Sequence, residues 1–544
     1  MSRILQSSAL ALALTAGWVS PAQAAAANQP GVADQLAAMQ AQLDRLSARV
    51  DSLEGQVAQE RARADAAEAR TGAAIAEAQA ARAETAKLAA TAAKPPEAPV
   101  AVAWKGAPEF SGKDGWTFKP RGRLHLDAGG VSAPGALTSP TLGDMRMRVR
   151  RARLGFEGTV PGGLGYKVEA DFANGGVGFG DVQLSYSPAN APLQLRIGNF
   201  ETLNSMEQIS SSNYNTFIER AAFNDAFINA RRLGAALAWK SRDDDLRAEL
   251  GLFAGHSIDS SLDNDGWIGA ARLAYAPKAL GGQLHLGVNY QYRDFASNIS
   301  GGTSSGTAMP SVNQLARYRA RPGSQITDVR FVDTGNFAAH GDSVLGLEAM
   351  AIFKGLYLSG EAQWVKTRAY RAGDLASGSD AFSGGNTAVV PLTDPTFFGA
   401  YGEVGYFLTG ETRGYKRGDG TWARTKVLKP VSKGGLGALQ LALRYEYLDL
   451  NDAALSGGLT NNFTSGATSL AGLDTRLGRG GTQSLYLVGL NWYLSDYMRF
   501  MVNYGRAEVQ GGPLAAQVLP TSTQPVNQRG YGVNVLQTRM QIDF

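Results

Sequence analysis

Arginine is concentrated in one short stretch of this 544-residue chain, Asp144–Glu157, which reads DMRMRVRRARLGFE. Its five arginines are Arg146, Arg148, Arg150, Arg151 and Arg153. Apolar residues alternate with them, and the alternation changes phase between Arg150 and Arg151, as a β-bulge would cause. We therefore predict a strand with a column of arginine side chains on a face that contacts water. The guanidinium group of arginine binds oxyanions through paired donors. The alternative is a solvated edge strand guarded by charge.

The composition and the N-terminus restrict the class of protein. The chain has 66 Gly, 19 Tyr and 21 Phe, only 18% charged residues, a net charge of +4 and no cysteine. Absence of cysteine excludes disulfides, thiolate catalysis and Cys-ligated metals. Arg3, the apolar run Ala9–Val19 and the small-residue site Ala22-Gln23-Ala24 predict a secretory signal peptide over residues 1–24. Since no other segment has the ~18 consecutive apolar residues of a membrane helix, we expect a periplasmic protein, a secreted protein or an outer-membrane β-barrel.

Residues 25–94 are predicted to form an α-helical coiled coil with an Ala-rich continuation. Apolar residues recur at alternating spacings of four and three, the seam of a coiled coil. The seam comprises Val32, Leu36, Met39, Leu43, Leu46, Val50, Leu53 and Val57. An amphipathic helix lying on its own domain is the alternative. Lys94-Pro95-Pro96 ends the helix, and residues 95–115 read as an extended Pro-rich linker.

Residues 116–544 repeat one pattern, short runs in which apolar and polar residues alternate, often with aromatic ends. In one run Leu284, Leu286 and Val288 oppose His285 and Asn289. Strict alternation of this kind is typical of transmembrane strands, with apolar side chains toward lipid and polar ones toward a lumen. Only a closed sheet crosses lipid without unpaired edges. We predict an all-β transmembrane β-barrel of about 16 antiparallel strands, rather than a soluble sandwich. The N- and C-terminal ends of the barrel segment are both expected on the periplasmic side.

The connectors between these runs alternate in length, as short periplasmic turns and long external loops require. Long connectors lie near residues 200–226, 296–341, 372–395, 451–481 and 511–530. One connector breaks the rule, since Thr409–Leu436 is long yet falls on the short-turn side. Its residues 411–435 hold seven Lys or Arg and two acids, so this turn would form a basic exit if it folded into the lumen.

Several motifs together make a family recognisable. They are RRARLGFEG (150–158), YKVEADFA (166–173), LRIGNFE (195–201), SSNYNTFIERA (211–221), GYFLTGETRGYKRGDG (405–420), GGLGALQLALRYEYLDL (434–450), LNWYLSDYMRFMVNYG (490–505) and QTRMQIDF (537–544). In these, residues 116–544 resemble the phosphate-selective porins of Gram-negative outer membranes, the porin O/P family. The resemblance implies a sixteen-stranded trimeric porin, an arginine-lined lumen and loops folded into the pore. Several relatives also carry an N-terminal periplasmic coiled coil.

An anion crossing a narrow pore exchanges its hydration for fixed positive charge, so arginines on polar strand faces are the candidate pathway. They are Arg123, Arg150, Arg151, Arg153, Arg196, Arg247, Arg272, Arg293 and Arg444. Loops that fold inward would add Arg220, Arg317, Arg319, Arg321, Arg330, Lys416 and Arg417. For each single arginine the alternative is an ion pair on the lumen wall, with Glu169, Glu249, Glu361 or Glu403 as partner.

Two departures argue against strict phosphate specificity. The third loop, residues 200–226, contains Glu201, Glu207, Glu219 and Asp225 against Arg220 alone, so the family's basic constriction residue has no assignable match there. Loops 255–266 and 372–395 hold three acids each and no Lys or Arg, which predicts an acidic outer mouth. We expect the closer-range lumen charges to dominate, because loop charges act through solvent with a Debye length of about 8 Å.

No catalytic constellation is present. The four histidines, His125, His256, His285 and His340, are scattered, and we predict no metal, no cofactor and no nucleic-acid partner. The predicted function is a water-filled, moderately anion-selective outer-membrane channel for passive uptake of phosphate or other small anions. The alternatives are a general diffusion porin, a structural tether or adhesin, and a barrel enzyme. Expected partners are outer-membrane lipid, two further copies in a homotrimer, and peptidoglycan through the coiled coil in the periplasm.

Overall fold

The computed structural model describes residues 32–91, 100–173, 175–227, 230–255, 257–258, 266–295, 315–370, 388–455, 459–462, 466–469 and 480–544. The chain divides into two compact units, residues 1–97 and 98–544. The predicted signal peptide lies outside the described residues, as do His256 and most of loops 255–266 and 372–395 that were expected to make an acidic mouth.

The first unit contains one helix, α1 (Val32–Thr91), 60 residues long. Its sequence is rich in alanine and lacks proline, which suits a long helix by propensity. Leu43 and Ile75 are exposed, and the side chains of the other seam residues lie outside the described ones. The coiled coil therefore stays a prediction. None of the helices in the described ranges is long and apolar enough to cross a membrane.

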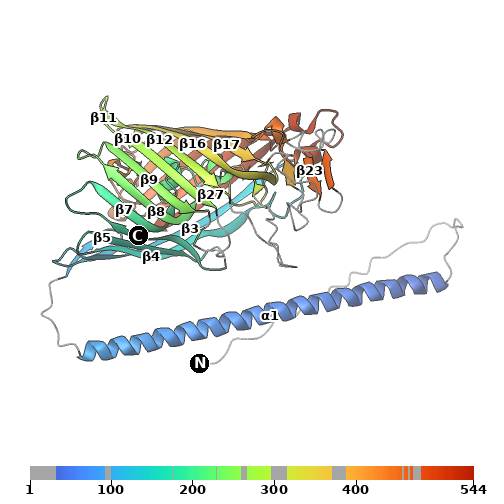
Figure 1. The fold of residues 1–544 in the computed structure, drawn as a ribbon, viewed down its shortest axis with the longest axis horizontal. Coiled ribbons are helices and arrows are strands. Elements are labelled where there is room, and N and C mark those ends of the chain that lie inside the picture. The colour runs from blue at the N-terminus through green and yellow to red at the C-terminus, as the bar shows by residue number, and fades with distance from the viewer. Residues whose placement is uncertain are drawn as a thin grey trace, which may run out of the picture. The chain divides into compact units, whose positions relative to one another are not determined.

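The second unit is a closed barrel of sixteen antiparallel strands, as predicted (Figure 1). It closes because the last strand pairs with the first, with Arg539 opposite Asp127. The sixteen strands are β3 (Thr117–Ser132), β4 (Arg146–Val160), β5 (Leu164–Asp171), β6 (Gly178–Tyr186), β7 (Leu193–Glu201), β8 (Arg231–Lys240), β9 (Leu246–Ala254), β10 (Trp267–Tyr275), β12 (Gly282–Asp294), β16 (Phe337–Phe353), β17 (Leu356–Ala369), β19 (Thr396–Phe407), β22 (Ala438–Asp449), β25 (Thr482–Ser495), β26 (Met498–Gln510) and β27 (Gly530–Asp543).

Alternation along each strand separates a lipid-facing surface from the lumen. The residues predicted to face lipid, Leu154, Phe156, Leu286, Trp492 and Phe544, are all exposed on the outside of the barrel. Next to them in sequence, His285, Asn491 and Asp543 are buried polar residues on the opposite face. The period-2 pattern of the sequence therefore correctly predicted which residues lie on the outer face of the barrel and which on the inner face.

The predicted bulge is present in β4. Arg151 pairs with His125 of β3, whereas Val149 pairs with Leu126, so Arg150 is the extra residue. The bulge turns both Arg150 and Arg151 toward the lumen, where their contacts lie. Because β4 pairs with β3 on one side and β5 on the other, it is an interior strand and not a charge-guarded edge.

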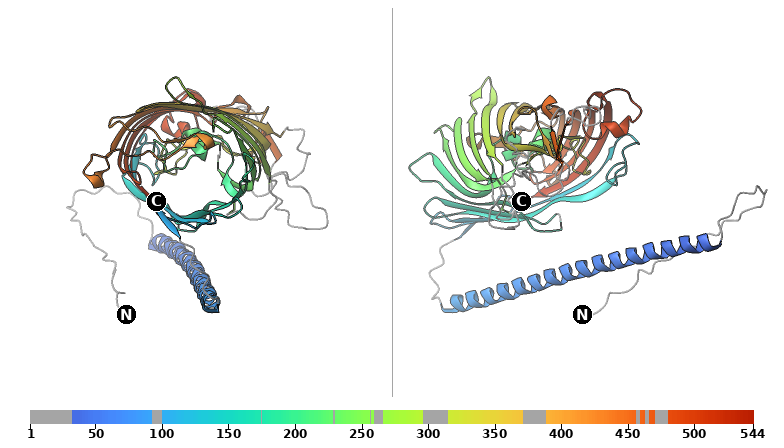
Figure 2. Two further views of the ribbon diagram at one scale, coloured as in Figure 1. Left: turned by 90° about the vertical axis from the view of Figure 1, so that its left-hand side faces the viewer. Right: turned by 45° about the vertical axis from the view of Figure 1, so that its right-hand side comes forward.

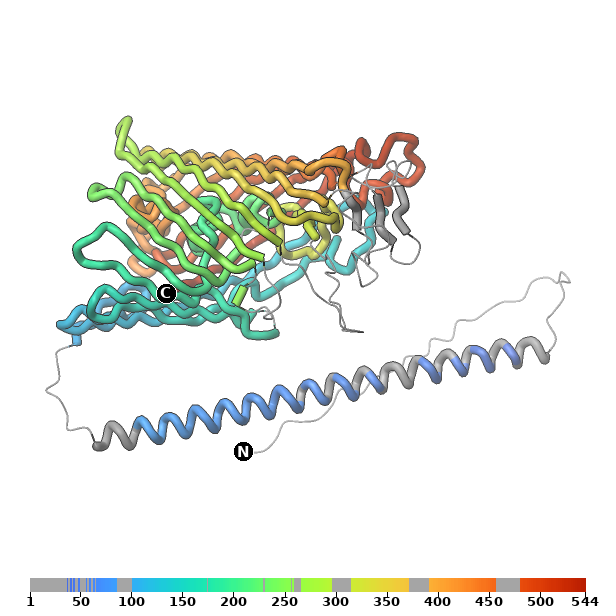
Figure 3. Tube along the Cα trace, in the orientation of Figure 1, coloured from blue at the N-terminus to red at the C-terminus, as the bar shows by residue number. Residues whose placement is uncertain are grey.

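Apart from the long turn 408–437, short turns lie at one end of the barrel and long connections at the other (Figure 3). The main buried apolar cluster lies where long connections fold into the barrel. Phe217, Phe223 and Phe227 of the third loop pack with Tyr318 and Phe337. This aromatic filling narrows the lumen, and it holds the third loop inside the barrel by apolar burial.

The barrel unit begins earlier than the sequence pattern indicated. Residues 101–111, assigned to a linker, form the hairpin β1 (Ala101–Trp104) and β2 (Pro108–Ser111), and β2 pairs with β3. Contact between the Phe110 and Phe118 rings supports this pairing. The short runs AVAW and PEFS were too brief to read as strands without a partner, since an isolated hairpin is only marginally stable.

The remaining elements belong to connectors. They are α2 (Met206–Ile209), α3 (Ala222–Ala226), β11 (Lys278–Ala279), β13 (Leu315–Ala316), β14 (Arg319–Ala320), β15 (Val332–Asp333), β18 (Ala388–Val390), β20 (Tyr415–Lys416), the 3₁₀ helix η1 (Arg417–Asp419), β21 (Thr421–Trp422), η2 (Val431–Lys433), η3 (Ala453–Leu455), β23 (Leu459–Asn462), β24 (Gly466–Ser469), α4 (Ala515–Val518) and η4 (Val526–Gln528).

Candidate functional site in the channel lumen

The third loop, described over residues 202–227, lies inside the barrel and carries α2 and α3. A view along the barrel axis shows loop segments within the ring of strands (Figure 2). Arg220 folds the loop on itself, because its guanidinium group donates to the carbonyl oxygens of Glu207, Gln208 and Ser210, each at 3.0 Å. Ser205, at a positive φ of 59°, caps α2 by accepting from the Gln208 amide. The loop is thus a folded constriction.

Arginines of the barrel wall fasten this loop through its backbone carbonyls. Arg539 donates to Ile218 O at 2.7 Å, and Arg499 donates to Asn215 O at 2.8 Å. Arg293 donates to Phe227 O at 2.6 Å. These contacts satisfy carbonyl oxygens that would otherwise be buried without a donor, which is costly.

Carboxylates of the wall accept from the amides of the same loop. Glu361 accepts from the Glu207 amide, and Glu446 accepts from the Ala222 amide, each at 2.8 Å. Glu207 also pairs with Arg444 at 2.6 Å. Many charged groups of the lumen therefore position the constriction.

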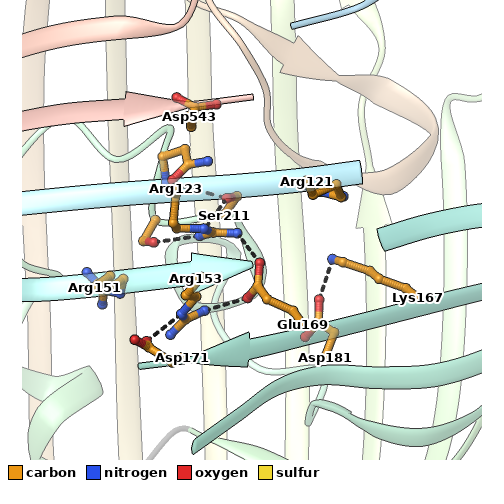
Figure 4. Close-up of polar contacts among 12 residues, drawn as sticks. Arg121, Arg123, Arg151, Arg153, Lys167, Glu169, Asp171, Asp181, Ser211 and Asp543 are labelled. Atoms are coloured by element: carbon orange, nitrogen blue, oxygen red, sulfur yellow. Dashed lines mark hydrogen bonds and ion pairs between the residues drawn. The ribbon is translucent and has the colours of Figure 1, made fainter. Parts of the chain in front are cut away.

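Eight of the nine predicted strand arginines have a carboxylate partner. Arg153 pairs with Glu169 and Asp171, both at 2.7 Å, and Arg123 shares Glu169 at 2.7 Å (Figure 4). The other pairs are Arg150 with Glu219, Arg196 and Arg247 with Glu249, Arg272 with Glu348, Arg293 with Asp342, and Arg444 with Glu207, Glu403 and Glu446. The wall ion pairs that the sequence left open are realised for Glu169, Glu249 and Glu403, while Glu361 accepts from the Glu207 amide and the Tyr401 hydroxyl.

Arg151 is the exception. It is buried, it lies 3.5 Å from His125 Nδ1, and among the described residues no carboxylate lies within ion-pair distance of it. Figure 4 shows its side chain beside the paired Arg153 without a contact to the other residues drawn. Its Nε atom is buried without a hydrogen-bond partner, so Arg151 carries its positive charge without a directly bonded counter-ion.

Arg151 borders a cavity of about 170 Å³ between β4, the third loop and the fifth loop, which is described over residues 315–336. The charged side chains that line it are Arg150, Arg151, Arg220, Arg321, Glu219 and Asp225. Arg220 also lacks a carboxylate partner in the described part of the chain and is held by carbonyl oxygens. Four cations face two anions here, so the cavity has a net formal charge of +2.

Glu219 is the acid that organises this cavity. Arg150 grips it with two hydrogen bonds, at 3.0 and 3.2 Å, and Arg539 adds a third at 3.0 Å. Burial would raise the pKa of Glu219, but the guanidinium groups of Arg150, Arg539 and Arg151 outweigh burial and hold the pKa well below its usual range. Glu219 is therefore ionised at neutral pH and neutralises part of the positive charge of the arginines that line the cavity.

The predicted loop cations have separate fates. Arg317 pairs with Asp333 at 2.6 Å, and Arg330 and Arg321 pair with Asp225. Arg319 is exposed on β14. These fifth-loop residues bring two arginines onto one acid of the third loop, which fastens the two loops to each other.

The long turn 408–437 divides into two parts. Residues 413–424 fold into the lumen, where the Trp422 amide donates to Ser210 Oγ at 2.9 Å and Arg272 donates to Gly420 O at 2.8 Å. Residues 426–437 instead protrude, with exposed lysines. The predicted basic exit is thus smaller than its sequence charge, because Arg417 pairs with Asp245 and Lys416 with Asp419 at the rim.

Two arginines at the site went unassigned at the sequence level. Arg499 and Arg539 lie on the polar faces of β26 and β27, and both are almost fully buried against the third loop. The same alternation that selected the other strand arginines would have found them. Nothing in the local sequence indicates that they bind loop carbonyls.

The histidines serve structural contacts in the described structure. His125 bonds Asn213 at 3.2 Å, and His285 lies between Glu348 and Tyr415. The described ranges contain no group of three or more His, Cys, Asp or Glu that could hold a metal ion.

A closed sixteen-stranded barrel with a loop folded into a charged lumen defines an outer-membrane porin channel. Residues 118–544 match the model of the phosphate-selective porin O and P family, and the chain belongs to that family.

Two relatives extend this comparison. The chain is 34% identical over 469 residues to an uncharacterized protein of Caulobacter vibrioides, covering 84% of this chain and 80% of that protein. It is 28% identical over 439 residues to Porin O of Pseudomonas aeruginosa, covering 76% of this chain and 87% of that one. The outer membrane channel DcaP of Acinetobacter baumannii superposes with a TM-score of 0.44 at 12% identity over 80% of this chain and 99% of that one, which is too weak a likeness to carry an inference.

Proposed function

We propose that this porin is a moderately anion-selective channel for phosphate or other small anions, in which Arg151 and Arg220 supply the uncompensated charge. The observation that carries the proposal is the cavity between the third and fifth loops, where these two arginines lack carboxylate partners. A partly desolvated passage strengthens such charges relative to loop charges in bulk solvent. Arginine suits phosphate because its planar fork donates in pairs.

The decisive measurement is the reversal potential of the purified channel in a KCl gradient. Arg151→Ala is expected to lower the anion-to-cation permeability ratio roughly two- to tenfold, because one unpaired charge leaves a confined path. The matched control is the double variant Arg153→Gln/Asp171→Asn, which removes a cation two residues away on β4 and the anion on β5 that pairs with it. It should leave the ratio close to wild type.

A cation-selective wild-type channel would contradict the proposal. So would a wild-type ratio in Arg151→Ala. Phosphate specificity is tested separately, by block of the chloride current with inorganic phosphate. Block that weakens in Arg151→Ala supports phosphate as cargo, and an absence of block favours a general diffusion porin.

The assembly is part of the same proposal. Family membership and the heptad seam of α1 support a homotrimer whose N-terminal arm lies in the periplasm. The arm precedes the first barrel strand at the short-turn end, which in porin-type barrels is periplasmic. A cysteine placed at Ala66 should resist labelling from outside intact cells, and labelling there would mean that the orientation is inverted.

A further inference from the structure

Residues 426–437, which we name the basic knob, stand out from the short-turn end of the barrel. Their exposed side chains include three lysines, three aliphatic residues and a serine, namely Lys426, Lys429, Lys433, Leu428, Val431, Leu436 and Ser432. Leu428 is 60% exposed and Leu436 is 76% exposed. Large aliphatic groups so open to the surroundings, interleaved with lysines, are characteristic of a surface that meets a membrane interface.

The basic knob is held in one shape. The Gly437 amide donates to Lys429 O at 2.9 Å and the Gly435 amide donates to Pro430 O at 3.1 Å. Gly434 and Gly437 adopt positive φ angles, which glycine reaches without strain. At its base, the Leu428 amide donates to the buried carboxylate of Glu411 at 3.1 Å. These contacts preorganise the exposed side chains.

The basic knob touches the outer wall of the barrel. The indole N–H of Trp492 donates to Leu436 O at 2.8 Å, and η2 packs against β25. Trp492 is on the lipid-facing surface, opposite Leu439 in the register of β22 and β25. Tryptophan concentrates where hydrocarbon meets headgroups, so this contact places the basic knob at the same level as the headgroups.

The charge of the basic knob is uncompensated. The segment KVLKPVSKGGLG contains three lysines and no acid. In the described part of the chain, none of the three lysines forms an ion pair. Lysines beside exposed aliphatic groups hold their ammonium ends at the interface while their stems cover apolar surface.

We propose that the basic knob binds the phosphate-bearing headgroups of anionic glycerophospholipids, with Lys426, Lys429 and Lys433 at the phosphates and Leu428 and Leu436 in the acyl region. Lysines near an anionic surface each contribute to such binding. The choice of glycerophospholipid over lipid A rests on the proposed periplasmic orientation of the short-turn end. The binding does not depend on ion selectivity, because the basic knob lies outside the lumen.

The test uses the full-length protein purified in detergent and titrated with phosphatidylglycerol or phosphatidylcholine, with bound lipid counted by native mass spectrometry. Wild type should prefer phosphatidylglycerol. Lys426→Gln/Lys429→Gln/Lys433→Gln should weaken its binding by about 100-fold, at roughly fivefold per lysine. The matched control, Lys113→Gln/Lys278→Gln/Lys354→Gln, removes three exposed lysines from other turns at the same end and should bind as wild type.

A second variant separates the apolar contribution. Leu436→Ser leaves the carbonyl that Trp492 uses intact and should weaken both lipids alike. Equal phosphatidylglycerol binding by wild type and the triple knob variant would overturn the proposal, as would an equal loss in the control. Preferential capture of lipid A over phosphatidylglycerol would overturn the choice of lipid. Reversal potentials of the knob variants should equal wild type, so failure here leaves the channel proposal standing.

Discussion

Arg151 on β4 and Arg444 on β22 are both buried arginines of the inner wall, but their surroundings are opposite in charge. Arg444 lies among three carboxylates, Glu207 at 2.6 Å, Glu403 at 2.5 Å and Glu446 at 3.3 Å. It also stacks over the rings of Phe217 and Tyr401. Arg151 has no carboxylate within ion-pair distance among the described residues, and Glu219, which lines the same cavity, is paired with Arg150 and Arg539 instead.

The difference shows that an arginine on a lumen face does not by itself produce anion selectivity. The Arg444 cluster carries a net negative formal charge and fastens the third loop, whereas Arg151 leaves its charge available to a passing ion. Different measurements therefore report on the two sites. Loss of Arg444 should change stability and conductance, and loss of Arg151 should change selectivity.

The largest effect is expected from Arg444→Met. The substitution leaves Glu207, Glu403 and Glu446 buried without their cation, a situation that typically costs about 3–5 kcal/mol. The third loop should detach from the wall, so the single-channel conductance should become larger and fluctuate more. The temperature at which the folded band disappears on a semi-native gel should also fall. Arg444→Lys, which keeps the charge, should recover part of the loss. Wild-type conductance and heat resistance in Arg444→Met would show that the loop is held without this cluster.

Glu219 should give an intermediate, pH-dependent effect. Its pKa in the folded protein is depressed, so its carboxylate stabilises the loop above the unfolded value of about 4.3, and this stabilisation is lost as pH falls through the folded pKa. From pH 5 to 7, the free energy of unfolding of wild type should therefore exceed that of Glu219→Gln by about 1–3 kcal/mol, which would appear as greater heat resistance. The gap should shrink only as pH falls below about 4. A gap that closes already between pH 7 and 5 would mean that the carboxylate is not held by Arg150 and Arg539.

The smallest effect is expected at the short-turn rim. Lys416→Gln/Arg417→Gln removes two cations that are partly exposed and paired with Asp419 and Asp245. Exposed ion pairs typically contribute about 0–1 kcal/mol, and solvent screens their charge. Reversal potential and heat resistance should both stay near wild type. A selectivity change as large as that of Arg151→Ala would move the selective region from the loop cavity to this rim.

Much of the barrel's architecture can be predicted from local sequence patterns. Alternation with period two sets which side chains face lipid, so Leu286 and Trp492 could be placed outside, and Arg151 and Arg444 inside, without coordinates. The phase change at Arg150 predicted the bulge for the same reason, since one extra residue inverts every side chain after it. The short runs at 101–111 escaped because their pairing with β3 is supplied by another strand.

The partners of the inward arginines could not be read in this way. Arg539 and Asp127 are 412 residues apart and meet only because β27 closes the barrel against β3 in one register. Arg444 reaches Glu207 because the third loop folds across the lumen, and Arg151 has no ion pair because no described acid of that loop comes within ion-pair distance of it. Local pattern thus determined the faces and the number of strands, while closure, register and loop folding decided which charges cancel, because ion pairing depends on distances that neighbouring residues in sequence do not set.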